Sequence, residues 1–571
     1  MEKIKKPLPI GVDNFEDIIS NEYYYVDKTL MIKELLDMKG KVTLFTRPRR
    51  FGKTLNLSML KYFFLDTGNE ELNEAHRHLF DGLKIMNEDK KYTDEMCAYP
   101  VIFLTLKSMK QPSFSSAFFK AKAEIRSEFE AHWKRIINSG ISDVRKEEYK
   151  RIMDGEAEYD DYSGSLKFLS ECIYDATGKK TIILIDEYDV PLENSYFNGF
   201  YDEMIFFIRS LFESALKTND YLEFAVITGC LRISKESIFT GLNHLDIISV
   251  LDTEYSEHFG FLPGEVEQML EFYELSDQKA VIKRWYDGYM FGNSEVYNPW
   301  SVIKYVKQLR SDKNAFPRPY WSNTSSNDIV KSLVERADWD TKEELEQLIA
   351  GKTIEKPVHE EITYDDIYKT QDNLWNFLFF TGYLKKVSER IETGENEGTI
   401  YLTMKIPNIE IKYIYNNCIV DWFNTEINKT DFHDFYTMMD KGDAESMRDV
   451  IEDQLMRTIS FYDSAENFYH GFMAGILNQS KTHIVKSNRE SGSGRSDIFV
   501  YTPNRRKKAY ILELKVSEKM EYLEKDAQKA LKQIEEKNYS YELKESGYSD
   551  IAVYGIAFYR KNCEVRYGGK V

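Results

Sequence analysis

The run TRPRRFGKT at residues 46–54 has the residue types of a loop that binds nucleotide phosphates. The apolar stretch Val42–Thr46 predicts a buried strand, and Lys53 and Thr54 open a predicted helix. A helix amino terminus attracts anions, Lys53 can reach the β- and γ-phosphates, and the Thr54 hydroxyl can bind Mg²⁺. Arg47 replaces the first glycine of the general pattern G-x-x-x-x-G-K-[ST], and a plain helix start is the alternative. The residues assigned to nucleotide binding here are Arg49, Arg50, Phe51, Gly52, Lys53 and Thr54.

The run TIILIDEYD at residues 181–189 supplies an acidic pair. Thr181–Ile185 predicts a buried strand that leads directly into Asp186 and Glu187. Ligands of α/β sheets bind at the carboxyl ends of the strands. We therefore expect Asp186 to bind Mg²⁺, directly or through water, and Glu187 to act as the catalytic residue that polarises the attacking water. A solvated strand end is the alternative.

A third buried strand is predicted at Phe224–Thr228. Thr228, at its end, can orient the water. Arg232 can contact phosphate in this chain or in a neighbouring copy, as an arginine finger does. Both residues are assigned to nucleotide binding, and a surface ion pair is the alternative for Arg232.

Two further strands, Ile498–Tyr501 and Ala509–Val516, flank a basic turn centred near Arg505. If the strands pair antiparallel about that centre, Asp497 lies opposite Glu513. Directly opposed residues share one face of a sheet, with Cα atoms about 4.5–5.5 Å apart. The hairpin is thus predicted to bring two carboxylates together.

Lys515 lies on the same face as Glu513, because it is two residues further along the strand. Carboxylate oxygens at this spacing suit Mg²⁺ or Mn²⁺. The metal can activate water and neutralise a phosphodiester, while Lys515 can position the nucleophile or stabilise charge. We therefore assign Asp497, Glu513 and Lys515 to catalysis in a metal-dependent nuclease. An exposed ladder of ion pairs is the alternative.

Composition sets the limits of these assignments. The 571 residues are 42% hydrophobic and 30% charged, which is typical of folded domains, and the length suggests roughly three or four of them. No apolar run approaches the roughly 18 residues of a membrane span. Five cysteines without CxxC spacing argue against a disulfide framework and favour the cytoplasm. The net charge of −19 argues against nonspecific coating of nucleic acid, although residues 38–65 and 481–519 are basic.

The order of predicted elements indicates an α/β multidomain protein. Short apolar runs separated by helical sequence, including Val101–Leu106, predict a parallel sheet with helices on both faces. The middle is helix-rich, and its aromatic residues Trp285, Tyr286, Trp300, Trp321 and Trp375 are expected in the core. The last hundred or so residues predict helix, two strands, helix and strand. The predicted domains are 1–255, 256–404, 405–455 and 456–571.

Several runs together resemble the bacterial AAA-ATPase-like family that carries a carboxy-terminal nuclease domain. They are YYYVDKT at 23–29, TRPRRFGKT, LIDEYDVP, TG-x-LRISKESIFTGLNHL, WYDGYMFG, VYNPWS, YWSNTSSN and FFTGYL. The resemblance implies an AAA-like P-loop sheet, a helical, winged-helix-like lid, and RPRRFGKT as the family's own loop form. It gives Asp27 and Lys28 no chemical role. The D…ExK hairpin likewise resembles the PD-(D/E)XK nuclease superfamily.

The nuclease resemblance adds two candidates on predicted helices. Glu466 opens ENFYHGFMAGIL and matches an acidic metal ligand of the superfamily, although with Asp463 it also fits a variant capping box. Gln533 either faces the site or lies exposed on its helix. The Arg505–Lys508 run either contacts the phosphate backbone or is a solvated basic turn.

The first functional hypothesis is an ATP-dependent, Mg²⁺-using NTPase whose nucleotide state controls a nuclease with Mg²⁺ or Mn²⁺ at its site. Its expected partners are ATP and nucleic acid, with DNA favoured over RNA, and AAA-like relatives suggest a homo-oligomer. Defence against foreign DNA or mobile-element biology is the setting suggested by this architecture. The alternatives are an ATP-dependent switch whose tail binds nucleic acid or a partner without cutting, and an adaptor with two vestigial sites.

Overall fold

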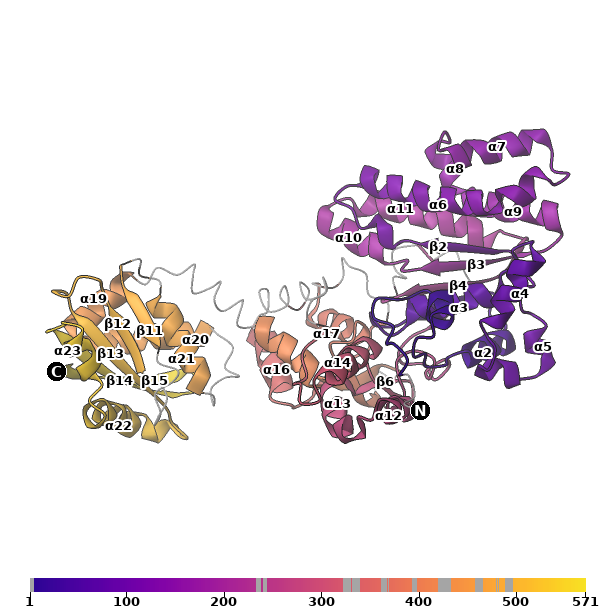
Figure 1. Cartoon of the computed structure of the whole chain (residues 1–571). Helices are drawn as coiled ribbons and strands as arrows, with labels where there is room; N and C mark the ends of the chain where they lie inside the picture. Colours follow the sequence, from indigo (N-terminus) through magenta and orange to yellow (C-terminus); the bar gives the residue numbers. More distant parts are fainter. Residues whose placement is uncertain are drawn as a thin grey trace. The chain divides into compact units, whose positions relative to one another are not determined.

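The computed structural model describes residues 5–232, 238–239, 244–321, 330, 339–360, 367, 369–392, 398–418, 433–457, 466–478, 480, 482–487 and 497–571. The chain forms two compact units (Figure 1). The first unit comprises Met1–Thr324 and Thr353–Tyr413, and the second comprises Ser325–Lys352 and Ile414–Val571. The backbone therefore passes between the units at three points.

A five-stranded parallel sheet with the order β2-β3-β4-β1-β5 organises the first unit. Its strands are β1 (Val42–Thr46), β2 (Val101–Thr105), β3 (Thr181–Asp186), β4 (Leu222–Gly229) and β5 (Leu245–Ile248). The first four confirm predicted strands, and every residue of β1 and β3 is buried. β5 was not predicted, because it is a short edge strand with an exposed Asp246 and lacks two apolar faces.

Helices pack against this sheet and extend beyond its edge. They are α1 (Phe15–Ser20), α2 (Leu30–Met38), α3 (Lys53–Phe64), α4 (Glu70–His78), α5 (Lys90–Thr93), α6 (Phe114–Ile137), α7 (Asp143–Asp154), α8 (Tyr159–Ser163), α9 (Ser165–Thr177), α10 (Val190–Asn198) and α11 (Tyr201–Phe212). Helix α3 packs against β2, β3 and β4, and its predicted apolar face is buried through Leu57, Leu60, Phe63 and Phe64. This packing fixes the start of α3 at the carboxyl ends of the strands.

Helix α6 covers the outer edge of β2 (Figure 1). The Glu128 carboxylate accepts a hydrogen bond from the Phe103 N–H at 3.0 Å, and His132 Nε2 lies 3.2 Å from the Val101 carbonyl oxygen. Glu128 and His132 are four residues apart on the helix, and their partners Phe103 and Val101 are two residues apart on the strand. The spacing of one pair therefore matches the spacing of the other. Burial raises the pKa of Glu128 to about 7 and lowers that of His132 to about 4. The edge is closed by side chains that favour their neutral forms.

Replacing Glu128 by glutamine should stabilise the first unit mainly at alkaline pH. The folded pKa of about 7 exceeds the ordinary 4.5, so the stability that this carboxyl contributes is full below pH 4.5 and is lost as the pH rises through 7. Glutamine keeps an acceptor for Phe103 without a charge. We expect the gain in unfolding free energy to be about 2 kcal/mol larger at pH 8 than at pH 5. Urea unfolding at the two pH values measures this difference. Glu130→Gln is the control, because Glu130 is exposed on the same helix. An equal gain in unfolding free energy at both pH values would contradict the prediction.

The first unit continues with helices and two small antiparallel sheets. The helices are α12 (Pro263–Tyr273), α13 (Lys279–Tyr286), α14 (Pro299–Ser311) and α17 (Gln371–Phe380). The strands are β6 (Tyr289–Phe291), β7 (Ser294–Val296), β8 (Ile354–Pro357), β9 (Lys385–Ile391) and β10 (Ile400–Lys405), paired as β6-β7 and β8-β10-β9. The helices confirm a helix-rich middle, whereas these short strands were not predicted.

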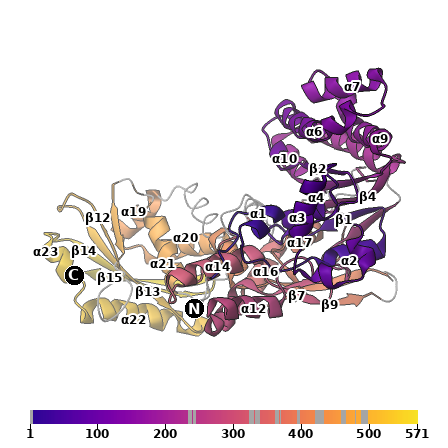
Figure 2. The same cartoon turned by 45° about the vertical axis from the view of Figure 1, so that its right-hand side comes forward.

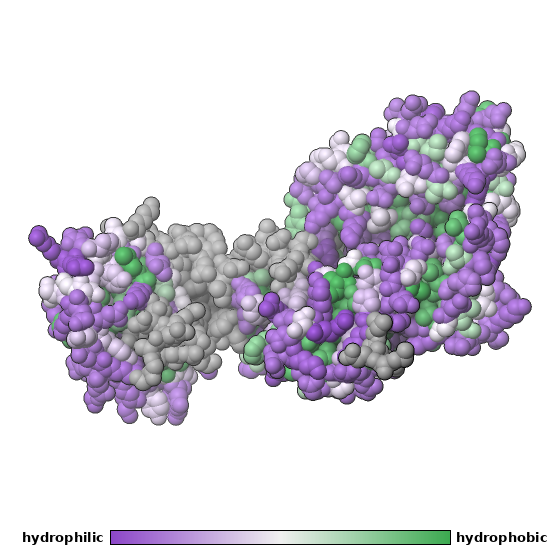
Figure 3. All heavy atoms as spheres, viewed as in Figure 1, coloured by the Kyte–Doolittle hydropathy of each residue, from purple (hydrophilic) through white to green (hydrophobic). Residues whose placement is uncertain are grey.

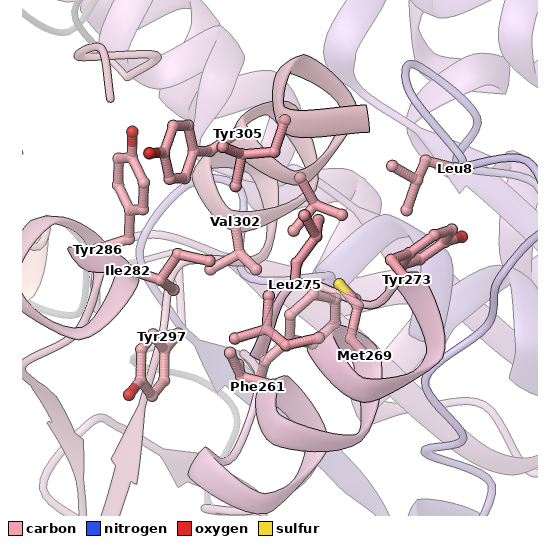
Figure 4. Close-up of a cluster of buried hydrophobic side chains, with 14 residues drawn as sticks. Leu8, Phe261, Met269, Tyr273, Leu275, Ile282, Tyr286, Tyr297, Val302 and Tyr305 are labelled. Carbon is pink, nitrogen blue, oxygen red and sulfur yellow. The ribbon is translucent and has the colours of Figure 1, made fainter. Parts of the chain in front are cut away.

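Apolar side chains from α12, α13 and α14 form the core of this region (Figure 4). Leu8 from the amino-terminal segment joins the same cluster. The expected burial is confirmed for Tyr286, Trp321 and Trp375. Trp285 is partly buried and packs against this cluster. The expectation was wrong for Trp300, which is only partly buried and is not part of the cluster.

A mixed five-stranded sheet with the order β11-β12-β13-β14-β15 organises the second unit. The strands are β11 (Ile484–Ser487), β12 (Asp497–Tyr501), β13 (Ala509–Val516), β14 (Ile551–Tyr559) and β15 (Asn562–Lys570). The helices are α16 (Trp339–Ile349), α19 (His433–Lys441), α20 (Ala444–Arg457), α21 (Glu466–Leu477), α22 (Leu523–Glu536) and α23 (Ser540–Glu545). Only β13 and β14 pair in parallel, and α22 packs along β13, β14 and β15 (Figure 2). The predicted order of elements is confirmed, with β11 and β15 in addition.

The molecular surface is predominantly hydrophilic on the face shown in Figure 3, with scattered hydrophobic residues. Within the described part of the chain, no helix combines the length and the apolar character needed to cross a membrane.

Candidate active sites

The loop between β1 and α3 has the geometry of an anion site. Gly52 adopts φ +89°, in the left-handed region that favours glycine, directly before α3. The Lys53 side chain is only 6% exposed, and its Nζ donates hydrogen bonds to the backbone oxygens of Arg47 at 2.8 Å and Pro48 at 3.0 Å. A phosphate would offer this ammonium a stronger, charge-assisted partner.

Three assigned side chains meet at the carboxyl end of β3. Asp186 is 1% exposed, and its Oδ2 accepts a hydrogen bond from Thr54 Oγ1 at 2.8 Å. Its Oδ1 accepts one from Thr228 Oγ1 at 2.5 Å, because β4 lies beside β3 in the sheet. The Thr54 hydroxyl and the Asp186 carboxylate supply oxygen ligands of the kind that Mg²⁺ prefers, so these two residues fit this ion.

Glu187 departs from the strand direction and lines a pocket. Its φ is +53°, which ends β3 abruptly. Burial, followed by the negative charge of Asp186, raises the pKa of the Glu187 carboxyl, while Lys53 and Lys107 lower it. A carboxyl with a raised pKa beside a phosphate loop suits a general base for water.

The next two residues of the IDEYD run hold the loop after β4. Tyr188 donates its hydroxyl hydrogen to the Leu231 carbonyl oxygen at 2.5 Å. The Asp189 carboxylate accepts hydrogen bonds from the backbone N–H groups of Cys230 at 2.7 Å and Leu231 at 3.3 Å. The run thus combines Asp186 and Glu187 with two positioning side chains.

A pocket of about 530 Å³ opens over the phosphate loop. Its size lies within the range of small-molecule sites. Its lining includes Glu187 and the assigned loop residues from Arg49 to Thr54. It also includes residues that sequence reasoning did not assign, among them Tyr24, Lys28, Lys107, Trp300 and Ile303. Trp300 was misread as core because an aromatic residue on an amphipathic helix has the same pattern whether it faces a core or a pocket.

The YYYVDKT run has a structural explanation. Asp27 caps the following turn by accepting hydrogen bonds from the backbone N–H and the hydroxyl of Thr29. Lys28 Nζ forms an ion pair with Glu265 at 2.6 Å and donates to the Glu257 carbonyl oxygen at 2.7 Å. Lys28 therefore ties the amino-terminal segment to the start of α12 at the pocket wall.

Arg47, the departure from the P-loop pattern, is a buried anchor. Its guanidinium lies 5.1 Å from the Phe259 ring centroid and 5.3 Å from that of Phe291. Its Nη1 donates to the carbonyl oxygens of Thr46 and Ile248 at 3.0 and 2.9 Å. Burial lowers the pKa of Arg47 to about 9. Arg47 thus attaches the loop to β5 and to the aromatic residues beyond it.

Restoring the general pattern with Arg47→Gly should damage the first unit. The substitution empties a space between two rings and removes two hydrogen bonds, so we expect a loss of about 3–5 kcal/mol in unfolding free energy. Weaker ATP binding should accompany it. Unfolding and ATP titration measure both effects, and Arg47→Met separates volume from hydrogen bonding. A glycine variant with wild-type stability and ATP affinity would refute this role.

The other two loop arginines each have partners in the protein. Arg49 forms an ion pair with Glu193 of α10. Arg50 Nη1 donates to the Tyr320 carbonyl oxygen at 2.9 Å, and the guanidinium lies 4.5 Å from the Trp300 ring centroid. The two arginines therefore contact different parts of the first unit.

Phe51 and Arg232 have partners of their own. The Phe51 side chain is buried and packs against Tyr289 and Phe291, with ring centroids 4.9 and 5.1 Å apart. Arg232 lies 3.6 Å from Glu360, as the ion-pair alternative expected. Contact of Arg232 with a nucleotide stays a prediction.

The carboxy-terminal hairpin has the predicted register. Asp497 of β12 lies opposite Glu513 of β13. The Glu513 side chain is 0% exposed, and Lys515 Nζ lies 3.7 Å from its Oε1. Lys515 also donates to Gln533 Oε1 at 2.5 Å, so Gln533 of α22 faces the hairpin. A buried carboxylate beside a fixed ammonium fits a divalent-cation site at a phosphodiester.

The first turn of α21 lies at the Lys515 end of the sheet. The Tyr469 ring stacks on Phe558 with centroids 4.3 Å apart, and Phe558 pairs with Val516. Glu466 begins this helix three residues earlier. Its position along the chain is therefore compatible with the metal-ligand assignment.

The side chains of Glu466 and Asp497, the other predicted ligands of the nuclease metal, fall outside the described part of the structure. Asp463, the partner of Glu466 in the capping-box alternative, falls outside it as well. Among the side chains that are described, no three His, Cys, Asp or Glu residues gather as metal ligands. The metal assignments stay predictions.

The basic turn lies at the far end of the hairpin from Glu513. Lys508, the basic residue nearest to Glu513 in sequence, precedes it by five residues, or roughly 16 Å along the strand. Lys508 forms an ion pair with Asp440 at 3.8 Å. The turn is therefore too distant to contact a phosphate at Glu513, although it can reach the backbone of a longer nucleic acid.

Two family models match the parts of the chain that contain the two candidate sites. Residues 9–239 match the family model described as predicted AAA-ATPase, and residues 464–567 match that of the PD-(D/E)XK nuclease superfamily. The chain joins an AAA-ATPase-like domain to a PD-(D/E)XK nuclease domain. The first match contains the whole phosphate loop and Asp186, and the second contains Asp497, Glu513 and Lys515. Domains of these kinds imply use of a nucleotide and a divalent metal.

One curated relative aligns with more than half of this AAA-ATPase-like and PD-(D/E)XK chain. It is an uncharacterized protein in the vnfD 5' region of Azotobacter chroococcum mcd 1, with 29% identity over 332 residues. The aligned part covers 58% of this chain and 56% of the relative. The chain thus spans little more than half the length of that protein.

Proposed function

We propose that the chain is an Mg²⁺-dependent ATPase whose nucleotide state controls a metal-dependent nuclease acting on DNA. The observation that carries the proposal is the Asp186 carboxylate, bonded by Thr54 and Thr228 beside a phosphate-loop lysine. The second group of charged residues, in the β12–β13 hairpin, supports the nuclease part. Defence against foreign DNA or maintenance of a mobile element is the proposed setting.

In the proposed ATPase reaction, Lys53 contacts the β- and γ-phosphates. Thr54 and Asp186 hold Mg²⁺, which neutralises charge on the phosphoryl oxygens when bound. Thr228 keeps the Asp186 carboxylate oriented, since it bonds the oxygen that Thr54 does not. Glu187 accepts the proton of the attacking water.

In the proposed nuclease reaction, Asp497 and Glu513 would hold Mg²⁺ or Mn²⁺. When bound, the ion would lower the pKa of water and neutralise charge on the phosphodiester. Lys515 stabilises charge that develops on the phosphate, and Gln533 fixes the direction of its ammonium. Removal of divalent ions with EDTA should therefore stop both reactions.

Two contacts in the first unit support the coupling of the two activities. The Trp321 N–H donates a hydrogen bond to Glu410 at 2.9 Å. Tyr320, the residue before Trp321, accepts a hydrogen bond from Arg50 of the phosphate loop. Trp321 and Glu410 each stand three residues before a point where the backbone enters the second unit. A nucleotide-dependent shift of either residue would therefore reach the connecting chain.

The test is a cleavage panel with the full chain. Linear, circular and single-stranded DNA and RNA are incubated with Mg²⁺ or Mn²⁺, with and without ATP, while phosphate release is followed. We expect metal-dependent cleavage of DNA whose rate changes with ATP. ATP hydrolysis with binding of nucleic acid but no cleavage would overturn the nuclease part in favour of a switch. Cleavage unaffected by ATP would overturn the coupling.

A further inference from the structure

Glu410 is a fully buried carboxylate that joins two parts of the first unit. It lies in the helical residues 409–418 and is 0% exposed. Its Oε2 accepts a hydrogen bond from Ser301 Oγ at 2.8 Å, and its Oε1 accepts one from the Trp321 N–H at 2.9 Å. A buried acceptor that two donors share holds those donors in one arrangement.

The residues beside these donors are the two supports of Arg50. Trp300 precedes Ser301, and its ring lies under the Arg50 guanidinium at 4.5 Å. Tyr320 accepts a hydrogen bond from Arg50 Nη1 at 2.9 Å and one from Trp300 Nε1 at 3.4 Å. Glu410 thus fixes both supports, although it is not among the described residues that line the pocket.

Arg50 itself depends on these supports. It lines the pocket beside Lys53 and adopts φ +70°, a backbone region that is unfavourable for a long side chain unless its surroundings hold it. A guanidinium that is already placed loses less conformational freedom when it binds phosphate. The cost of ordering Arg50 is therefore met by the folded protein before a nucleotide enters.

We propose that Glu410 is a positioning residue of the nucleotide pocket and acts on nucleotide affinity through Arg50. This inference rests on the proposed binding of ATP. Without its carboxylate, Ser301 and Trp321 lose their common acceptor, and the Trp300 ring and the Tyr320 carbonyl no longer hold the guanidinium. Phosphate binding then includes the cost of ordering the Arg50 side chain.

The test is a double-mutant cycle on the full chain, with Mg²⁺-ATP affinity measured by calorimetric titration. Glu410→Leu should weaken binding about 5- to 20-fold when Arg50 is present, as expected for the loss of preorganisation of one charged contact. In an Arg50→Met background the same substitution should change affinity less than about twofold. Arg49→Met is the matched background, because Arg49 is paired with Glu193 instead, and there the full effect of Glu410→Leu should persist.

Glu410→Gln provides the conservative variant. It retains an acceptor for the backbone and a polar partner for Ser301, so its affinity should stay within about threefold of wild type. A loss from Glu410→Leu that is equal in the wild-type and Arg50→Met backgrounds would overturn the inference, as would a glutamine variant as weak as the leucine variant. A wild-type chain that does not bind Mg²⁺-ATP would refute the proposed function instead.

Ser301→Ala covers the case in which Glu410→Leu does not fold. It removes one donor to the Glu410 carboxylate and leaves that carboxylate in place as the acceptor of the Trp321 N–H. We expect a smaller loss of ATP affinity, again only when Arg50 is present. A loss independent of Arg50 would count against the inference.

Discussion

Replacing Lys53 by alanine should abolish the proposed ATP hydrolysis and weaken ATP binding by at least about 100-fold. A charge-assisted hydrogen bond to phosphate is worth about 1.5–3 kcal/mol, and 100-fold corresponds to about 2.7 kcal/mol. The Lys53 ammonium is already buried beside the loop carbonyls of Arg47 and Pro48, so a phosphate needs only a small movement of it. Calorimetric titration gives the affinity, and phosphate release gives the rate.

The control for this prediction lies on the same helix. Lys61→Ala removes a lysine two turns along α3, whose Nζ lies over the Phe103 ring at 5.0 Å. Its ATP affinity should match wild type. Asp186→Asn should bind ATP but lose about 10²- to 10³-fold in hydrolysis, because the Mg²⁺ ligand is weakened. Wild-type ATP affinity in Lys53→Ala would rule out the assignment of this loop to phosphate.

The predictions of the main strands and of the hairpin, which depended on local periodicity, were confirmed. The bounds of β13 and the pairing of Asp497 with Glu513 follow from an alternating strand and the centre of one turn. Distance from the turn determines the partner in a hairpin, so no information from elsewhere in the chain is needed. The strand, loop and helix around Lys53 were predictable for the same reason.

Features that depend on distant residues were not predictable. Arg47 departs from the general phosphate-loop pattern, and its structural role depends on Phe259 and Phe291, which lie more than 200 residues further along the chain. The sequence assigns no role to Lys28, because its ion-pair partner Glu265 lies 237 residues further along the chain. Neither contact has a local pattern, since side-chain chemistry alone does not say which distant element will lie opposite.

Replacing Glu513 by glutamine should abolish nucleic-acid cleavage and leave ATP hydrolysis intact. Glutamine has nearly the same shape and fits the buried position, but it removes the negative charge that a divalent cation requires. We expect a rate loss of at least about 10³-fold, because metal activation of water and charge neutralisation are lost together. Lys515→Ala should lose about 10²- to 10³-fold by removing one charged stabiliser. Cleavage in Mg²⁺ and in Mn²⁺ measures both.

Glu521→Gln is the matched control for Glu513→Gln, because Glu521 is 66% exposed and lies after the hairpin. Its cleavage rate should equal that of wild type. Thermal unfolding and ATP hydrolysis establish that the Glu513 variant is folded. Cleavage by Glu513→Gln within about threefold of wild type would place the chemistry elsewhere, since no metal-ligand carboxylate tolerates loss of its charge at so small a cost. Retained nucleic-acid binding with lost cleavage would assign Glu513 to the chemical step.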